Sequence, residues 1–312
     1  MTLINQNNFI HFPDQYYKPS YRIGPFKTSD IALCHEGGNH FIARDFFNDF
    51  IDSKNWQYTI SGKEAINIAL SELNLTQKDC VSVLTSSGNK YIASCVTNEI
   101  EKFCSWSRDI KSNTAAIFVN HEFGYPHRNL ADLKKYNLPI IEDACHSFFA
   151  NTNKEDIGLI GDFIIYSLPK IFPMQLGGLI FFDKKYEKIP QKTINNNERN
   201  YIENIISSSI KNIEAMKSKR LENYTALKIL FASLGCKPWF NKLKNDVPGV
   251  FLFSVPGNFD LSALKEHVIS HGIECSIFYD ERAFFIPCHH RLQHDDLKYF
   301  FSVFEVFFQK NL

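Results

Sequence analysis

The sequence predicts an α/β protein: a three-layer α/β/α large domain with a mostly parallel sheet, followed by a small C-terminal α/β domain. Three observations predict this fold class. Between about residues 57 and 183, short apolar runs alternate with longer amphipathic stretches. Polar turns follow several of the apolar runs. After Gly235 the pattern of apolar and polar residues changes, and a second, shorter series of predicted strands and helices begins.

Composition sets the size and the class of the protein. With 312 residues, of which 44% are hydrophobic and 22% charged, we expect a soluble chain with domains at residues 1–230 and 231–312. A formal net charge of zero gives no reason to expect nucleic acid or a membrane surface as a partner. No apolar stretch approaches the roughly 20 residues of a membrane span, and residues 1–17 show no signal-peptide pattern. Eight scattered cysteines without a Cys-x-x-Cys pair favour reduced thiols in a cytoplasmic protein.

The large domain reads as a series of strands and helices. A helical stripe of apolar residues follows Ser61-Gly62 and continues to Leu73. The predicted strands are Trp56–Ile60, Val81–Leu84, Ala115–Val119, Pro139–Glu142, Ile164–Ser167 and Leu179–Phe182, and the further helices are Tyr91–Phe103 and Leu130–Tyr136. Strands that alternate with helices imply a mostly parallel sheet that is covered on both faces.

The second half begins with a connector at residues 185–200, which is rich in Lys, Asn and Gln. A long helical stretch is predicted from Tyr201 to about Leu234. A β-α-β unit follows, and a phenylalanine-rich terminal helix ends the chain. Their predicted ranges are Gly249–Val255, Leu261–Ser270, Ile273–Phe278 and Leu292–Phe308.

Polar segments follow four of the predicted strands: Thr85–Asn89, Asn120–Pro126, Asp143–His146 and Ser167–Lys170. Ligands of open α/β sheets gather at the carboxyl ends of the strands. We therefore expect these four segments to converge on one site.

Asp143 and Lys170 provide an acid and an amine at two of these strand ends. Enzymes that use pyridoxal 5'-phosphate (PLP) need this pair, because a lysine forms the Schiff base and a carboxylate keeps the pyridine nitrogen protonated. Each residue also has a simpler interpretation. Lys170 could extend to solvent from a loop, and Asp143 could cap a helix.

Other polar residues have two interpretations as well. His146 could bind a planar ring or be a satisfied core histidine. Ser61-Gly62 and Ser86-Ser87-Gly88 could bind a phosphate through backbone N–H groups, with Ser167 adding a hydroxyl, or could serve as caps and turns. His289-His290 lies beside Cys288, but no second cluster has ligand spacing, so we expect no metal site.

Taken together, these segments resemble the DegT/DnrJ family of PLP-dependent sugar aminotransferases, within the fold type I, aspartate-aminotransferase-like group. The resemblance covers about residues 57–183 and 215–310. The similar motifs are Ser61-Gly62-Lys63-Glu64-Ala65, Phe123-Gly124-Tyr125-Pro126, Glu142-Asp143-Ala144-Cys145-His146, Gly161-Asp162, Tyr166-Ser167, Lys170, Gly177-Gly178, Ile286-Pro287-Cys288-His289 and Asp295-Asp296-Leu297.

The resemblance implies a role for each candidate site residue. Lys170 would carry the cofactor and act as the general acid and base, and Asp143 would bind the pyridine nitrogen. His146 would lie near the ring hydroxyl, and Tyr91 is the candidate for stacking on the ring. Ser61, Gly62 and Ser167 would bind the phosphate.

The resemblance also implies a reaction. An amino group, with glutamate as the expected donor, would pass to a keto-deoxy sugar nucleotide for surface polysaccharide. A homodimer is expected, because sites of this fold type form at subunit interfaces.

The sequence departs from the family pattern in places, which keeps other functions open. Lys63 stands where many members have threonine, and the spacing from Ser167 to Lys170 is shorter than usual. Residues 183–215 are shortened where the family has an asparagine that reaches the partner's phosphate, a role in which Asn195–Asn197 could substitute. The alternatives are a catalytically inactive paralogue that acts as a scaffold or partner subunit, and a PLP enzyme that acts on an amino acid.

Overall fold

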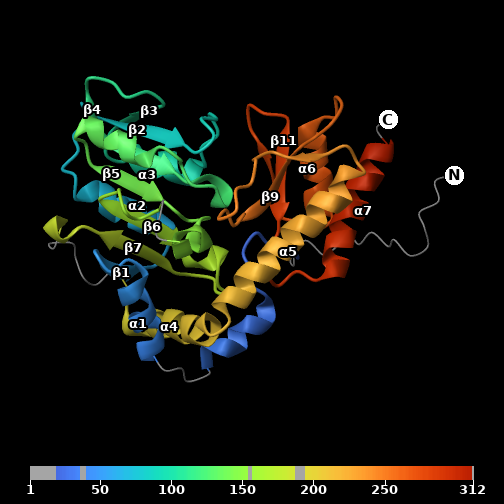
Figure 1. Cartoon of the computed structure of the whole chain (residues 1–312), viewed down its shortest axis with the longest axis horizontal. Coiled ribbons are helices and arrows are strands. Elements are labelled where there is room, and N and C mark those ends of the chain that lie inside the picture. The colour runs from blue at the N-terminus through green and yellow to red at the C-terminus, as the bar shows by residue number, and fades with distance from the viewer. Residues whose placement is uncertain (1–18, 36–39, 154–156, 187–193, 311–312) are drawn as a thin grey trace. The chain divides into compact units, whose positions relative to one another are not determined.

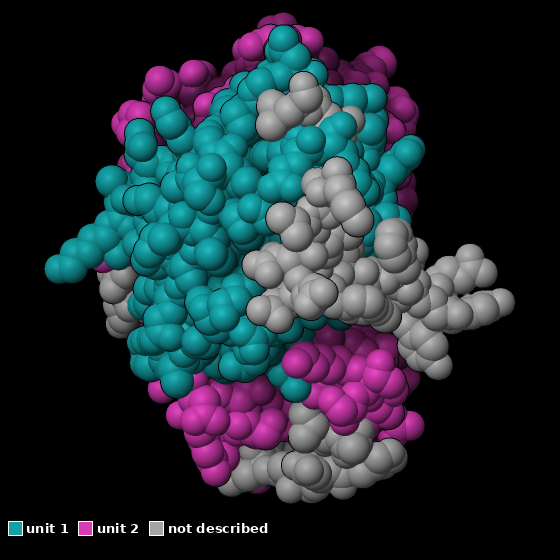
Figure 2. All heavy atoms as spheres, turned by 90° about the vertical axis from the view of Figure 1, so that its right-hand side faces the viewer, with its two compact units in different colours: residues 1–25, 214–244, 248–312 teal, residues 26–213, 245–247 magenta. Residues whose placement is uncertain are grey.

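The computed structural model describes residues 19–35, 40–153, 157–186 and 194–310 (Figure 1). Contacts between Cα atoms divide the chain into two compact units (Figure 2). Unit 1 contains residues 1–25, 214–244 and 248–312, and unit 2 contains residues 26–213 and 245–247. The boundary predicted at 230/231 stays a prediction. No helix in the described ranges is long and apolar enough to cross a membrane.

Unit 2 is built on a seven-stranded sheet in the order β1-β7-β6-β5-β4-β2-β3. The strands are β1 (Asn55–Thr59), β2 (Cys80–Thr85), β3 (Ser105–Ser107), β4 (Thr114–Asn120), β5 (Ile140–Asp143), β6 (Phe163–Ser167) and β7 (Gly178–Phe182). Strands β3, β2, β4, β5 and β6 pair in parallel, whereas β7 is antiparallel to both of its neighbours, β6 and β1. The predicted fold class, with a mostly parallel sheet, is confirmed.

Helices cover both faces of this sheet. Helices α2 (Gly62–Ser71) and α3 (Ser94–Ile100) share a core with one face, in which Ala65 and Ile66 pack with Ile141, Ile165 and Ile180. On the other face, the Phe50 ring of α1 (His40–Phe50) contacts the rings of Tyr166 and Phe181. Helix α4 (Asn196–Ile210) lies beside α1 (Figure 1). The result is the predicted three-layer arrangement.

Several predicted boundaries are wrong, and each has a local cause. Helix α3 begins at Ser94 rather than Tyr91, because the Asn89 side chain accepts the Tyr91 N–H and holds that residue in a turn. The helix predicted from Tyr201 is two helices, α4 and α5 (Ile213–Ala232). Helix α4 starts inside the predicted connector, because Asn195 and Glu198 form a capping box.

Unit 1 contains a four-stranded sheet in the order β10-β11-β9-β8, in which every neighbouring pair is antiparallel. The strands are β8 (Lys237–Pro238), β9 (Val250–Ser254), β10 (Ser276–Phe278) and β11 (Ala283–Pro287), and the remaining helices are α6 (Leu261–Ser270) and α7 (His294–Lys310). Because β11 lies between them, β9 and β10 run parallel to each other, as the predicted β-α-β unit requires.

One core joins the helices and the sheet of unit 1. Phe231 of α5 contacts Phe253 of β9 and Phe304 of α7, with ring centroids 4.9 and 5.1 Å apart. Leu264 and Val268 of α6 are fully buried in the same cluster. Burial of large aromatic side chains is the main source of stability in such a core.

Candidate active site

The four polar segments predicted to converge do follow adjacent strands. Thr85 at the end of β2 pairs with Asn120 at the end of β4, and Asn120 pairs with Asp143 at the end of β5. Asp143 pairs in turn with Ile165 of β6, two residues before Ser167. Parallel pairing therefore brings the carboxyl ends of β2, β4, β5 and β6 to one edge of the sheet, where α/β folds bind ligands.

Ser61 and Gly62 form the start of α2. The Ser61 hydroxyl caps the helix by accepting the Glu64 N–H, and the Glu64 carboxylate accepts the Ile60 N–H. A Cβ on Gly62 would lie 3.2 Å from Cys145 Sγ and 3.3 Å from Ser167 Cβ. The helix N-terminus thus lies directly against Ser167 and leaves room for no larger residue than glycine without a shift. Helix N-termini favour phosphate groups.

Lys170 ends the short 3-10 helix η6 (Leu168–Lys170), directly after β6. Gly177 ties this turn to the start of α2: its N–H donates to Ile60 O over 2.8 Å, and its carbonyl accepts the Leu168 N–H over 3.1 Å. Gly177 has φ +126°, a conformation that side chains rarely adopt. The double link places the half-buried Lys170 and Ser61 on segments that are joined to each other.

Asp143 is 8% exposed at the end of β5. Its Oδ1 accepts the Cys145 N–H over 3.0 Å. A carboxylate at a strand end is suited to binding a protonated ring nitrogen.

Two thiols show that Lys170 and Asp143 lie within electrostatic reach of the same place. Burial raises the pKa of Cys95, the positive charge of Lys170 lowers it, and the negative charge of Asp143 raises it. Burial likewise raises the pKa of Cys145 well above 9.0; there Asp143 raises it further and Lys170 opposes the shift. Lys63 also lowers the pKa of Cys95, which locates this ammonium group near the same site.

Three rings line the edge of the site. The rings of Tyr91 and Phe123 are stacked with centroids 6.3 Å apart, and the rings of Phe123 and His146 are tilted with centroids 5.3 Å apart. Phe123 has φ 52° within the short 3-10 helix η3 (Glu122–Gly124). A left-handed phenylalanine is strained by about 1–2 kcal/mol, so the surrounding contacts must hold it.

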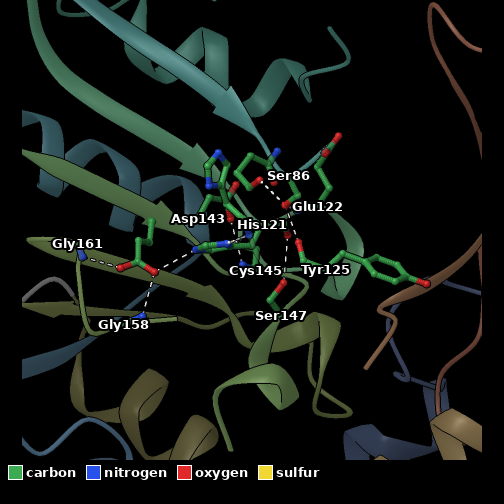
Figure 3. A network of polar contacts seen from close by, with 12 residues as sticks. Ser86, His121, Glu122, Tyr125, Asp143, Cys145, Ser147, Gly158 and Gly161 are labelled. Atoms are coloured by element: carbon green, nitrogen blue, oxygen red, sulfur yellow. Dashed lines mark hydrogen bonds and ion pairs between the residues drawn. The ribbon is translucent and has the colours of Figure 1, made fainter. Parts of the chain in front are cut away.

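Those contacts come from the turn after β2. The Ser86 hydroxyl accepts the Glu122 N–H and donates to Tyr125 O (Figure 3). The Ser87 N–H donates to the Glu122 carboxylate over 2.7 Å. Burial raises the pKa of Glu122. The Ser87 N–H, predicted as one option for phosphate, binds a carboxylate of the chain itself.

The sequence analysis did not predict the buried pair Glu142 and His121, which lies next to Asp143. Glu142 is fully buried, and its carboxylate binds His121 Nε2 at 3.0 Å and the N–H groups of Gly158 and Gly161 at 2.9 and 2.6 Å (Figure 3). One signal for it exists in the sequence. A glutamate in the apolar run Ile140-Ile141-Glu142 requires partners if it is buried, and a histidine follows the neighbouring strand.

Two other features lie apart from this constellation. A cavity of about 780 Å³ is lined by residues of β1, α1 and α4, including Arg44, Trp56 and Glu203, and contains none of the predicted site residues. Among the side chains that the structure describes, no three His, Cys, Asp or Glu residues gather as a metal site would require.

Residues 105–196 match the sequence model of the DegT/DnrJ/EryC1/StrS aminotransferase family. This segment includes Asp143, His146, Ser167 and Lys170, and the resemblance inferred from the sequence is confirmed there. No curated protein matches the chain.

Several solved structures with the same fold are described as aminotransferases. The aminotransferase TlmJ from Streptoalloteichus hindustanus has a TM-score of 0.72 at 13% identity, with 93% of this chain and 99% of that chain covered. The aminotransferase from Psychrobacter cryohalolentis has a TM-score of 0.68 at 15% identity, with coverage of 93% and 99%. Spr1654 from Streptococcus pneumoniae, proposed to be a sugar aminotransferase, has a TM-score of 0.73 in its PLP form at 12% identity, with coverage of 95% and 100%.

Proposed function

We propose that the chain is a PLP-dependent aminotransferase that acts on a sugar substrate. The observation that carries the proposal is the position of Asp143 at the end of β5 and of Lys170 just after β6. The charges of both residues act on the thiols of Cys95 and Cys145. The family match over residues 105–196 and the PLP form of one structural neighbour support the choice of cofactor.

The described residues fit this cofactor. The buried Asp143 carboxylate at the end of β5 would accept the pyridinium N–H. Gly62 at the N-terminus of α2 lies close to Ser167, and Ser61, Gly62 and Ser167 would hold the phosphate. His146 would reach the ring hydroxyl, and Tyr91 would cover the ring face.

When bound, PLP supplies an aldehyde that condenses with amines and a ring that withdraws electrons. Lys170 Nζ would anchor it covalently and, once displaced by the incoming amine, would move a proton between carbon atoms of the reactants. The Asp143 carboxylate would hold the proton on the pyridine nitrogen throughout. The capped N-terminus of α2 would fix the phosphate so that the reacting carbon stays within reach of Lys170.

The finer assignments are also proposals. The amino donor is glutamate, the acceptor is a keto-deoxy sugar nucleotide, and the product serves surface polysaccharide. We further propose a cytoplasmic homodimer. The cytoplasm is supported by free cysteines throughout the described side chains, and the homodimer by the family resemblance.

Reconstitution with PLP tests the activity. The wild-type protein should turn yellow, and borohydride should fix the cofactor on the Lys170 peptide, as mass spectrometry would show. Lys170→Ala should lose this attachment, because it removes the amine that forms the Schiff base. Lys102→Ala, which removes an exposed lysine paired with Glu99, should keep it. A wild-type protein that stays colourless at saturating PLP would sink the proposal.

Half-reactions with purified nucleotide keto-sugars and with simple keto acids identify the acceptor. Turnover of keto acids alone would refute the sugar assignment and favour the amino-acid enzyme. A catalytically inactive scaffold is the second candidate, because the Asn195 side chain, a possible replacement for the family's phosphate-binding asparagine, caps α4 instead. A protein that binds PLP but catalyses neither half-reaction would favour this candidate.

A further inference from the structure

The side chain of Glu142 is a buried hydrogen-bond acceptor in the core of unit 2. It is fully inaccessible, and three donors satisfy it: His121 Nε2, Gly158 N and Gly161 N. A Cβ on Gly161 would lie 2.7 Å from Glu142 Cγ and Oε1, so only glycine fits there. Burying a carboxylate without such partners would cost several kcal/mol of stability. Here the N–H groups of Gly158 and Gly161 and the ring of His121 offset that cost.

The hydrogen bonds of His121 fix its tautomer. Nδ1 accepts the His127 N–H over 3.1 Å, so this nitrogen carries no proton. The ring proton therefore resides on Nε2 and is donated to Glu142. His121 is 1% exposed, and no solvent competes for these contacts.

The backbone of His121 is bonded on both sides to the segment that carries Asp143. Its N–H donates to Asp143 O over 3.0 Å, and its carbonyl accepts the Ser147 hydroxyl over 3.1 Å. All four polar atoms of His121 are thus used, and three of the four partners are Glu142, Asp143 and Ser147. Figure 3 shows His121 next to Asp143 and Ser147.

Glu142 cannot act on the cofactor directly. Successive side chains of a strand point to opposite faces, so Glu142 and Asp143 leave β5 in opposite directions. Any effect of Glu142 must pass through the backbone that it shares with Asp143.

We propose that His121 and Glu142 are positioning residues that hold the Asp143 carboxylate at the pyridine nitrogen of the cofactor. The inference rests on the proposed function. A displacement of about 1 Å in a catalytic group lowers rates by roughly a hundredfold. The His121–Glu142 contact is a side-chain link between β5 and the segment that follows β4.

Two substitutions of His121 test the roles of its two ring nitrogens separately. His121→Asn keeps an acceptor near Nδ1 for His127 and loses the donor to Glu142, whereas His121→Gln places an N–H near Nε2 and keeps that donor. We expect His121→Asn, reconstituted with PLP, to bind PLP about tenfold more weakly and to lower the rate of the amino-donor half-reaction by roughly tenfold to a hundredfold. His121→Gln should recover most of both losses.

The visible absorbance of the cofactor bound to Lys170 provides the decisive readout. Its pH midpoint depends on how firmly Asp143 holds the ring proton, so it should shift in His121→Asn and return in His121→Gln, with little change in KM for the sugar substrate. His271→Asn is the matched control: it removes a histidine that is 3% exposed in unit 1 and should leave the midpoint unchanged.

The outcomes are distinct. If wild-type protein forms no visible band with PLP, the proposed function fails. If wild type forms the band and folded His121→Asn shows the same midpoint, PLP affinity and rate, the positioning role alone fails. If His121→Asn does not fold, Ser147→Ala removes only the bond to His121 O. A smaller shift in the same direction then supports the proposal, and an unchanged midpoint overturns it.

Discussion

At the scale of a single residue, His290 makes the stability of this protein depend on pH. Burial lowers the pKa of His290 from 6.5 to about 3, with further lowering by the positive charges of Arg220 and Arg291. Its Nδ1 is buried and lacks a hydrogen-bond partner within the described chain. The native state therefore keeps this imidazole neutral at a pH where the unfolded chain would protonate it.

We expect the free energy of unfolding to fall as the pH drops below 6.5. Between pH 6.5 and about 3, the unfolded chain binds one more proton at this residue. That difference lowers stability by up to about 1.4 kcal/mol per pH unit. Urea unfolding of wild type and His290→Gln between pH 5 and 7 measures the slope, which should be flatter in the variant. His294→Gln, at an exposed histidine, controls for the new glutamine, and equal slopes in wild type and His290→Gln would contradict the assignment.

Sequence reasoning at this scale named candidate site residues at the strand ends and missed the buried pair His121 and Glu142. Asp143 and Lys170 were visible because each follows an apolar run that ends in an unusual polar group. The roles of the predicted site residues stay predictions. His121 and Glu142 were not visible as a pair, because only the register of β4 against β5 reveals that they meet. Such pairing depends on tertiary contacts that no local pattern contains.

At the scale of the element, α4 depends on its capping box. Asn195 Oδ1 accepts the Glu198 N–H over 3.0 Å, and the Glu198 carboxylate accepts the Asn195 N–H over 2.7 Å. Asn195→Ala should lower the free energy of unfolding by about 1 kcal/mol, as measured by urea denaturation. Asn195→Asp retains the acceptor and should stay near wild type. A loss in both variants would show that Asn195 contributes something other than the cap.

The elements that the sequence predicted well are those with long apolar patterns. Helix α6 was predicted with its observed bounds, since Asp260 caps it and its apolar spacing is regular. Helix α1 was not predicted. Strand β11 was not predicted either. It is buried from Ala283 to Pro287, so its sequence lacks the alternation of apolar and polar residues that marks a half-exposed strand. The break between α4 and α5 was also hidden, because apolar residues continue on both sides of it.

At the scale of the whole molecule, the candidate site residues lie in one unit, and each unit has its own sheet. The candidate residues Lys170, Asp143, His146, Ser167, Ser61, Gly62 and Tyr91 all belong to unit 2. Unit 1 has its own antiparallel sheet and its own aromatic core. A ligand that binds only the native form of one unit stabilises that unit by mass action.

PLP should therefore protect unit 2 from local unfolding more than unit 1. At a PLP concentration a hundred times its Kd, the gain is about 2.7 kcal/mol, which corresponds to roughly a hundredfold slower exchange of amides that open with the whole unit. Hydrogen exchange with mass spectrometry would compare peptides of β4, β5 and β6 with peptides of β9 and β11. Lys170→Ala should reduce the gain, since the covalent anchor is lost. Protection that rises in β9 and β11 but not in β5 and β6 would contradict the location of the site at the strand ends of unit 2.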